Sequence, residues 1–522
     1  MAISPSGNIG SEKATCSATN LHHQYISGTI DVVDATPPQN TPVELRPDHP
    51  FNWTTRRKVK VTALALLTTF TTLPNGTAIV VAHEALSQEW GISDGHFPNS
   101  VWPVTSWTLG GAVSSLFVLP IMEDFGVRPW FLSTHFLFLC FIIPQALAEN
   151  FATLLVCRFF AGGCVSILAN TAASVIGNIW EGDRARTVPL SLFMTTFLAG
   201  SSAGPILGAA ILQNLTWRWI SYIQLIVLGA IFPLYYFFFD ECRGSVINAS
   251  RVRNASRERN PAGFGLTIDS STPAILRRKL LASVRRPLHM LFTEPVVFVF
   301  TLWSSFVVGT VYMLTQSVEQ VFHTLYDFNS SQGGYMQAAV ILGEAIGLVT
   351  VLFARPIYWA SASRNKQIPG APIPESRLYL SLIGSFCGLT GGMFVYGWTA
   401  WPSMPWVAPA IGLVMVGFGM DLIIIAITDY TIDAYNAYAG SCVAAVVLGE
   451  NLSASFLPLA VQGMYRSLGL QWASTPQSEK PIHEEREHPE IGRTDRLLPI
   501  DADNANPWSI RVDQSLMGTM LE

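Results

Sequence analysis

Four ionisable side chains lie inside long apolar stretches of this 522-residue sequence: Arg158, Glu344, Asp421 and Glu450. An ionisable group costs free energy inside a membrane, so residues of this kind indicate a functional site. A carboxyl group beside an arginine can take up and release a proton as its surroundings change. These residue types therefore predict proton binding and release along a path through a membrane.

Each of these side chains also allows a structural interpretation. Arg158 could form a structural ion pair or donate hydrogen bonds to the backbone, and the carboxyl groups could join neighbouring helices. We expect Glu344 and Glu450 to lie deep in the membrane. Asp421 should lie nearer the cytoplasmic side, where it could simply face water. Asn75 could line a substrate path or could belong to a Pro-Asn-Gly kink.

The elements that must position these residues are membrane-spanning helices. The sequence is 50% hydrophobic and 13% charged, against about 25% charged residues in a typical soluble domain. A helix that crosses a bilayer needs about 20 mostly apolar residues. By this criterion we predict eleven spans, near residues 61–82, 99–120, 129–148, 151–176, 188–212, 219–239, 296–317, 335–354, 377–397, 407–428 and 440–461.

The order of the spans predicts an all-α, polytopic membrane protein made of two helical bundles around a central cavity. Two bundles joined by a polar segment are an architecture of transporters, with the substrate handled between the halves. We expect a disordered cytoplasmic tail at 1–55, a six-helix bundle at 56–240, a basic cytoplasmic linker at 241–290, a five-helix bundle at 291–470 and a polar tail at 471–522.

Lysine and arginine predict the orientation, because they are enriched in cytoplasmic loops. They gather before the first span, in the 241–290 segment and after the eighth span, whereas the loops 83–98, 318–333 and 398–406 have none. The N-terminus should therefore be cytoplasmic, in a multi-pass protein of the plasma membrane. Asn214 and Asn329 are then glycosylation acceptors in outer loops, and the acceptor motif at Asn248 should stay unmodified.

Other classes of function find little support in the residues. The net charge is −5 and no basic amphipathic face is present, so we expect no nucleic-acid partner. Most of the seven cysteines lie in apolar runs without metal-ligand spacing, which predicts no metal site. No nucleophile triad or phosphate-binding loop stands out. We therefore expect neither an enzyme nor a bound cofactor.

A run of small residues in the fifth span carries a family resemblance. Gly200, Gly204, Pro205 and Gly208 are spaced so that a neighbouring helix backbone can approach closely. This run resembles the Gly-x-x-x-Gly-Pro-x-x-Gly-Gly motif of antiporters, with an alanine in place of the last glycine. Together with Trp217-Arg218-Trp219, Pro374-Glu375-Ser376-Arg377-Leu378 and Tyr430-Thr431-Ile432-Asp433-Ala434-Tyr435, it makes the chain similar to the major facilitator superfamily, in the fungal branch of twelve-span drug:proton antiporters.

The resemblance implies the major facilitator fold and roles for several residues. Arg158 lies in a segment similar to the family's span-four Arg-Phe-x-x-Gly motif, where it would pair with a carboxylate and tune proton binding. Glu123, Gly126 and Arg128 match part of the family's cytoplasmic loop motif, although Asp124 replaces a cation. Spans 1, 2, 4, 5, 7, 8, 10 and 11 would line the cavity, and the four buried charges all lie on them.

The resemblance ends before the family's twelfth span. After Ala473 the sequence stays polar, and its longest apolar run is Leu497-Leu498-Pro499-Ile500. The leading hypothesis is a proton-coupled exporter of small organic compounds such as drugs, toxins or fungal secondary metabolites. Its partners would be the lipid bilayer, a small-molecule substrate and protons. Two alternatives stay open: a truncated, non-transporting relative, and an uptake symporter of the same fold.

Overall fold

The computed structural model describes residues 49–92, 99–244, 246–248, 284–365, 372–435 and 439–473. Within these ranges, the side chains of 118–125, 183, 462 and 465–473 are not described. All the described residues belong to one unit, Met1–Gln477, and a second unit, Ser478–Glu522, lies outside them. Most of the predicted tail 1–55, much of the linker 241–290 and nearly all of the tail 471–522 also lie outside the described residues.

The described ranges fold into helices, and they contain no strand. The first half of the chain contributes α1 (Thr55–Thr72), α2 (Pro74–Thr77), η3 (Ala78–Ala82), α3 (His83–Trp90), α4 (Trp102–Phe125), α5 (Val127–Ala146), α6 (Phe151–Ile179), α7 (Asp183–Leu212) and α8 (Arg218–Phe238). The second half contributes α11 (Pro295–Tyr326), α12 (Ser330–Tyr335), α13 (Ala338–Ala360), η6 (Pro374–Arg377), α14 (Leu378–Ile383), η7 (Gly384–Thr390), α15 (Gly391–Thr399), α16 (Val407–Tyr435) and α17 (Ala439–Ala473).

The helices confirm the predicted all-α membrane architecture. Ten helical segments among the described residues are long and apolar enough to cross a membrane, and they match ten of the eleven predicted spans. The remaining predicted span, 99–120, corresponds to α4, a helix of 24 residues. Such helices satisfy their own backbone hydrogen bonds, which the interior of a bilayer requires.

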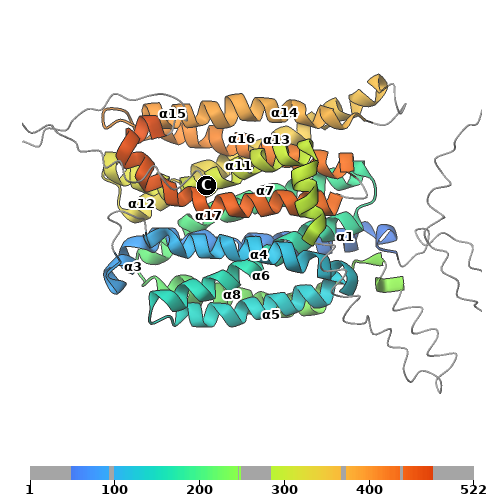
Figure 1. Cartoon of the computed structure of the whole chain (residues 1–522), viewed down its shortest axis with the longest axis horizontal. Helices are drawn as coiled ribbons and strands as arrows, with labels where there is room; N and C mark the ends of the chain where they lie inside the picture. Colours follow the sequence, from blue (N-terminus) through green and yellow to red (C-terminus); the bar gives the residue numbers. More distant parts are fainter. Residues whose placement is uncertain are drawn as a thin grey trace, which may run out of the picture. The chain divides into compact units, whose positions relative to one another are not determined.

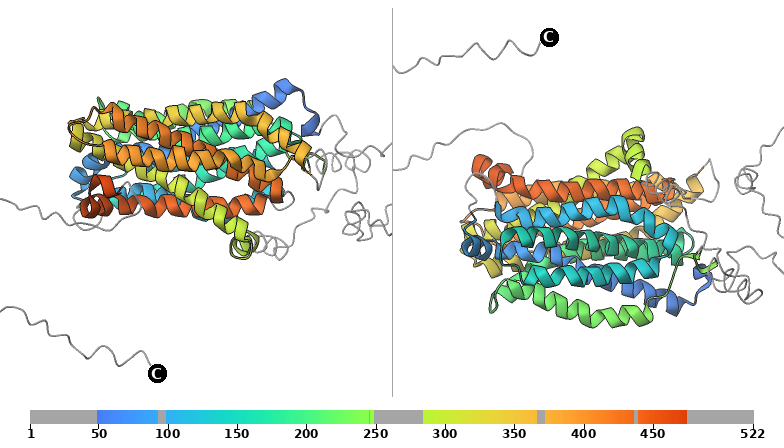
Figure 2. Two further views of the ribbon diagram at one scale, coloured as in Figure 1. Left: turned by 90° about the horizontal axis from the view of Figure 1, so that it is seen from above. Right: turned by 60° about the horizontal axis from the view of Figure 1, so that its bottom comes forward.

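Two packed groups of helices follow the order of the chain. In the first half α6 packs against α1, α4 and α5, and in the second half α16 packs against α13 and α15 while α11 packs against α17. Figure 1 shows α5, α6 and α8 together, and α14, α15 and α16 together. Two seams join the groups: α4 with α17, which run side by side in Figure 2, and α7 with α13. The boundaries 56–240 and 291–470 remain our prediction for the two bundles.

One end of the bundle is rich in arginine and lysine. Here α1 begins, α7 begins and α13 ends, and side chains from different helices meet, as Arg355 does with the backbone of Arg184. We call this the basic end, and the other end, where α3 and α12 lie, the opposite end. The positive-inside bias predicts that the basic end faces the cytoplasm.

The first span is not one continuous helix. It runs as α1, then breaks at Pro74-Asn75-Gly76 into α2 and the 3₁₀ helix η3. Proline lacks a backbone N–H group, so a carbonyl in the preceding turn loses its helical partner. The Pro-Asn-Gly kink that the sequence allowed is therefore present, and it leaves carbonyl groups that another residue must satisfy.

The ninth span contains a π-helical segment, η7, between α14 and α15. Two glycines of this segment, Gly384 and Gly388, approach α16 closely. A Cβ atom on Gly388 would lie 2.5 Å from the Cα atom of Gly419 in α16, which shows how closely the two backbones approach. A π-helical turn inserts one extra residue and often marks a functional position in a helix. The sequence predicted a plain span at 377–397.

Candidate functional site

Arg158 is fully buried in α6 and binds the break in the first span. Its guanidinium group donates hydrogen bonds to the backbone oxygens of Asn75 (3.1 Å), Gly76 (2.7 Å) and Pro103 (2.6 Å). Among the described residues no carboxylate forms an ion pair with it. In this conformation Arg158 therefore makes the backbone hydrogen bonds of the structural alternative and not the carboxylate pair that the family resemblance implies, and its role in proton binding stays a prediction. The backbone hydrogen bonds form because the broken helix offers free carbonyl groups close by.

Asn75 lies in the same buried polar group. Its side chain donates to Gln224 Oε1 (2.6 Å) and accepts from Trp107 Nε1 (3.0 Å). It does not line the central cavity, although Trp107 does. Its side chain therefore connects the broken first span to α4 and α8, and the suggestion that Asn75 lines a substrate path is not what the structure shows.

A central cavity of about 80 Å³ lies between the two halves of the chain. Its walls come from α4, α6 and α7 on one side and from α11, α16 and α17 on the other. Apolar side chains make up most of the lining, and the polar ones that we single out are Ser166, Asn170, Tyr312, Thr428, Glu450 and Asn451. A concave, mostly apolar site with few polar groups is the usual form of a small-molecule site.

Among the described residues that line this cavity, Glu450 is the only carboxylate. Its Oε1 atom accepts a hydrogen bond from the hydroxyl of Ser304 in α11, and the neighbouring Asn451 also faces the cavity. A second cavity, of about 220 Å³, lies toward the basic end and shares Asn170, Met194 and Thr428 with the first. The central cavity therefore continues toward the basic end of the bundle.

Glu344 and Asp421 lie in the seam between α7 and the second half of the chain. Both side chains are fully buried, and each accepts a hydrogen bond from a hydroxyl group on α7: Ser202 to Glu344 Oε1 (2.9 Å) and Thr195 to Asp421 Oδ1 (2.8 Å). The other oxygen of each carboxyl group, Oε2 of Glu344 and Oδ2 of Asp421, has no hydrogen-bond partner among the described residues.

The expectation that Asp421 could face water is wrong. Asp421 packs against α13, where a Cβ atom on Gly347 would lie 2.9 Å from Asp421 Oδ2. The depth of a residue along its helix could not reveal this, because the glycine on the neighbouring helix is what allows the close approach. Depth alone did correctly predict that Glu344 is buried.

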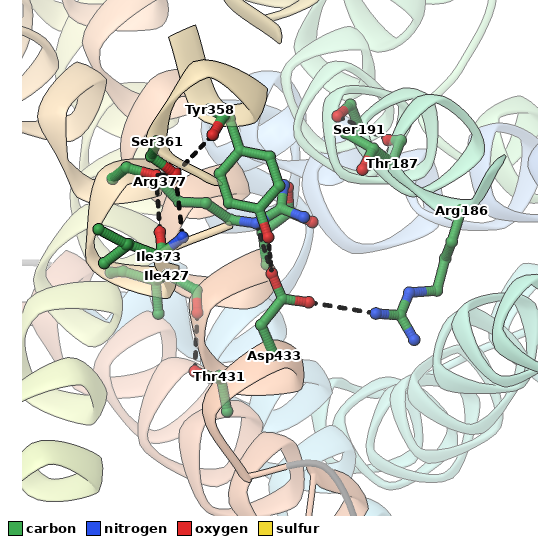
Figure 3. Close-up of polar contacts among 12 residues, drawn as sticks. Arg186, Thr187, Ser191, Tyr358, Ser361, Ile373, Arg377, Ile427, Thr431 and Asp433 are labelled. Carbon is green, nitrogen blue, oxygen red and sulfur yellow. Dashed lines mark hydrogen bonds and ion pairs between the residues drawn. The ribbon is translucent and has the colours of Figure 1, made fainter. Parts of the chain in front are cut away.

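A network of charged residues joins the halves at the basic end (Figure 3). Asp433 in α16 accepts hydrogen bonds from Arg377 Nε (2.6 Å), the hydroxyl of Tyr358 (3.1 Å) and Arg186 Nη2 (3.2 Å). Arg377 also pairs with Asp429, one helical turn before Asp433. Since Arg186 begins α7, this network connects the first half of the chain to the second.

These network residues were not among the predicted site residues. The segments that hold Arg377 and Asp433 were noted only as part of the family resemblance. Charges near the ends of predicted spans are usually solvated, so nothing local distinguished them. The spacing of Asp429 and Asp433 was an available signal, because residues four apart share one face of a helix.

The opposite end holds two further charged contacts that the sequence did not reveal. Glu89 in α3 accepts hydrogen bonds from Arg218 Nη2 (2.6 Å) and Trp217 Nε1 (2.7 Å). Glu319 is buried near the end of α11, with Oε2 lying 3.9 Å from His83 Nδ1. The predicted span ended at residue 317, which left Glu319 in a loop. In the structure α11 extends nine residues further, to Tyr326, and therefore includes Glu319.

The predicted loop motif lies at the basic end. Gly126 separates α4 from α5 with a φ of 97°, a left-handed conformation that favours glycine. Arg128 donates to the backbone oxygen of Tyr236 (2.9 Å), and its own N–H group donates to Glu241 Oε2 (3.0 Å). Glu123 belongs to α4, and its side chain lies outside the described residues. The role of this motif stays a prediction.

The glycine run of α7 lies against the broken first span. A Cβ atom on Gly204 would lie 1.9 Å from Thr77 Oγ1, and one on Gly208 would lie 2.3 Å from the backbone oxygen of Ala78. A Cβ atom on Gly200 would lie 3.2 Å from the Cβ atom of Leu73. The small residues therefore allow the close helix approach that their spacing predicts, and Pro205 lies within the same stretch of α7.

Both predicted glycosylation acceptors are exposed. Asn214 lies between α7 and α8. Asn329 caps α12, with its Oδ1 atom accepting a hydrogen bond from the backbone of Gln332 (2.8 Å). The Nδ2 atom, to which a glycan would be attached, is not used in that contact.

Comparison with known proteins identifies the family. The model of the Major Facilitator Superfamily matches residues 64–458, which is most of the chain. The chain belongs to the Major Facilitator Superfamily. Proteins of this family are membrane transporters, so the chain is a multi-pass membrane transporter of small molecules and not an enzyme.

Relatives within the Major Facilitator Superfamily include fungal proteins. The MFS transporter cpaT of Aspergillus oryzae is 32% identical over 442 residues, which cover 82% of this chain and 85% of cpaT. The efflux pump FUBT of Fusarium oxysporum is 28% identical over 373 residues, covering 71% of this chain and 62% of FUBT. These relatives are consistent with the fungal branch that the motifs suggested.

Solved structures of Major Facilitator transporters share the fold. The xylose transporter XylE from E. coli, in a partially occluded inward open conformation, matches with a TM-score of 0.59 and 13% identity. The match covers 80% of this chain and 95% of XylE. The predicted major facilitator fold is therefore confirmed.

Proposed function

We propose that this transporter is a proton-coupled exporter of small, largely apolar organic compounds in the plasma membrane. The observation that supports this best is the pair of buried carboxyl groups, Glu344 and Asp421, in the seam with α7. Each is held by one hydroxyl group from the other half of the chain. Neither forms an ion pair with a described residue.

The coupling follows from the cost of burying charge. An ionised carboxylate without a cation is costly in an apolar interior, whereas the neutral carboxyl group is tolerated when it is hydrogen-bonded. The seam between α7 and the helices α13 and α16 therefore closes most readily when Glu344 and Asp421 carry protons. If the halves separate, water reaches the two groups and the protons can leave. Proton binding and helix movement are thereby linked.

The central cavity supports the proposed substrate class. Its lining is mostly apolar, so burial of an apolar compound would supply most of the binding free energy. Glu450, Asn170 and Asn451 provide a few hydrogen-bonding groups that could orient the compound. The relative FUBT is named an efflux pump, which favours export as the direction.

Transport in vesicles tests the coupling. We would reconstitute the full chain into liposomes and measure the movement of a fluorescent apolar compound under an imposed pH gradient. Glu344→Gln and Asp421→Asn should each lower gradient-driven transport by about tenfold or more, because the neutral side chains keep their shape but cannot release a proton. The exposed Glu375 supplies the matched control, since Glu375→Gln should transport as the unaltered chain does.

The same assay distinguishes the alternatives. Movement of compound and protons in the same direction would support an uptake symporter. Folded protein that moves no compound in any gradient would support a non-transporting relative. Gradient-dependent transport that is unchanged in both carboxyl variants would contradict the roles of Glu344 and Asp421.

We also propose that the basic end faces the cytoplasm and that Asn214 and Asn329 carry glycans. In a yeast host, removal of glycans by an endoglycosidase should shift the protein on a gel. Asn214→Gln and Asn329→Gln should each abolish part of that shift, whereas Asn248→Gln should leave it unchanged. A shift that depends on Asn248 instead would show that the basic end faces away from the cytoplasm, which would contradict the proposed orientation.

A further inference from the structure

A groove that opens sideways from the bundle lies between α13 and α14. Both helices pack on α16, but they make few contacts with each other. A cavity of about 160 Å³ fills the space between them near the basic end. Its floor is formed by apolar side chains of α16, namely Leu422, Ile425 and Ala426.

The rim of the groove faces the surroundings of the bundle. Ile357 of α13 is 53% exposed, and Tyr379 and Ile383 of α14 are 51% and 52% exposed. Large exposed apolar side chains on spanning helices contact lipid. The groove is therefore accessible from the membrane, and it shares no described lining residue with the central cavity.

A cation with unused hydrogen-bonding capacity lines the groove. Among the residues that the structure describes, the buried Nε atom of Arg355 has no hydrogen-bond partner, and Nη2 donates to the backbone oxygen of Arg184 (3.2 Å). No carboxylate among the described residues pairs with Arg355. Arg377, on the other wall, differs because it is neutralised by Asp429 and Asp433.

The residues around Arg355 suit the boundary between lipid and water. Trp359, one turn further along α13, lines the groove, and the guanidinium group of Arg184 lies over its ring at 4.6 Å. Tryptophan and tyrosine are enriched at this boundary, where their rings contact both phases. Arginine groups there attract anionic headgroups. Polar contacts thus gather at one end of the groove, and apolar side chains continue from them.

We propose that this groove binds an anionic phospholipid of the cytoplasmic leaflet. The phosphate group accepts hydrogen bonds from Arg355 at the basic end, and an acyl chain lies on Leu422 and Ile425 between α13 and α14. The groove shares Tyr358, Arg377 and Asp429 with the charged network at the basic end, and the proposal rests on the proposed cytoplasmic location of that end. A cationic occupant does not fit, because the lining carboxylate Asp429 is already paired with Arg377.

Native mass spectrometry of the full chain in detergent tests the site. We would titrate the purified protein with phosphatidylserine or phosphatidylcholine of identical acyl chains and count the bound lipids. The first phosphatidylserine should bind about fivefold more tightly than phosphatidylcholine, as expected for one arginine near an anionic headgroup. Arg355→Gln should remove this preference, and Arg355→Lys should keep most of it.

Two variants separate the site from general effects. Arg364→Gln removes an exposed cation at the same end that does not line the groove, and it should leave the lipid preference unchanged. Ile383→Trp should fill the groove and weaken the binding of both lipids without removing a buried charge. Equal binding of the two lipids by the unaltered chain would overturn the proposal. So would phosphatidylserine binding that survives both Arg355→Gln and Ile383→Trp.

Discussion

Arg158 shows how a single residue can be essential for a structural reason. Its three hydrogen bonds go to backbone oxygens, two of them at the break between α1 and η3. Inside a bilayer no water is available for such oxygens, so each unsatisfied one costs several kcal/mol. The arginine therefore makes a broken first span possible in the core of the protein.

Replacement of Arg158 should destabilise the protein as well as stop transport. Arg158→Gln keeps one polar group but loses most of the hydrogen bonds, and we expect a loss of about 2 kcal/mol or more in stability. Thermal unfolding in detergent, followed by tryptophan fluorescence, would measure it. Arg184→Gln, at an exposed arginine, is the control and should change the unfolding temperature little. An Arg158→Gln protein with unaltered stability would contradict the structural role.

At the scale of elements, α7 has two faces with different tasks. Thr195 and Ser202 lie seven residues apart, so they share one face, and that face contacts α13 and α16. Gly200, Gly204 and Gly208 lie on the other face, against Leu73, Thr77 and Ala78. The helix is therefore fixed to the first half by its glycines while its hydroxyl groups reach the buried carboxyl groups of the second half.

A methyl group on the glycine face should disturb this arrangement. Gly204→Ala places a Cβ atom 1.9 Å from Thr77 Oγ1, so the helices must separate or Thr77 must lose its 2.7 Å hydrogen bond to the Ser201 oxygen. We expect about 1–3 kcal/mol of destabilisation, with weaker transport. Gly229→Ala on α8 meets no atom within 4 Å and serves as the control. The unfolding temperatures of the two variants provide the comparison, and equal values would argue against close packing.

At the scale of the whole molecule, contacts between the two halves surround the central cavity. The seams are α4 with α17, where Ser455 bonds to Thr108 (2.9 Å), and α7 with α13 and α16. At the basic end, Asp433 adds a charged contact to Arg186 of α7. We therefore expect this contact to limit access to the cavity from the basic end.

Neutralising Asp433 should open the basic end more often. In a chain cleared of its native cysteines, a cysteine at Ala173, which lines both cavities, would report access of a maleimide reagent. Asp433→Asn should raise the labelling rate by about fivefold, the change expected for a contact of about 1 kcal/mol. Asp240→Asn breaks the pair with Arg57, which lies within the first half, and should not change the rate. An unchanged rate in Asp433→Asn would show that this contact does not control access.

The sequence by itself determined the helices, the family and the buried position of Glu344. The length of an apolar run and the depth of a residue within it are local properties, since the bilayer sets them for each segment separately. The tertiary structure alone decided which polar groups meet. Ser202 and Glu344 are 142 positions apart, and Thr195 and Asp421 are 226 apart. Arg158 likewise donates to two oxygens, of Asn75 and Gly76, that become free only where another helix breaks. Contacts of this kind depend on how helices pack against each other, and no local spacing encodes that.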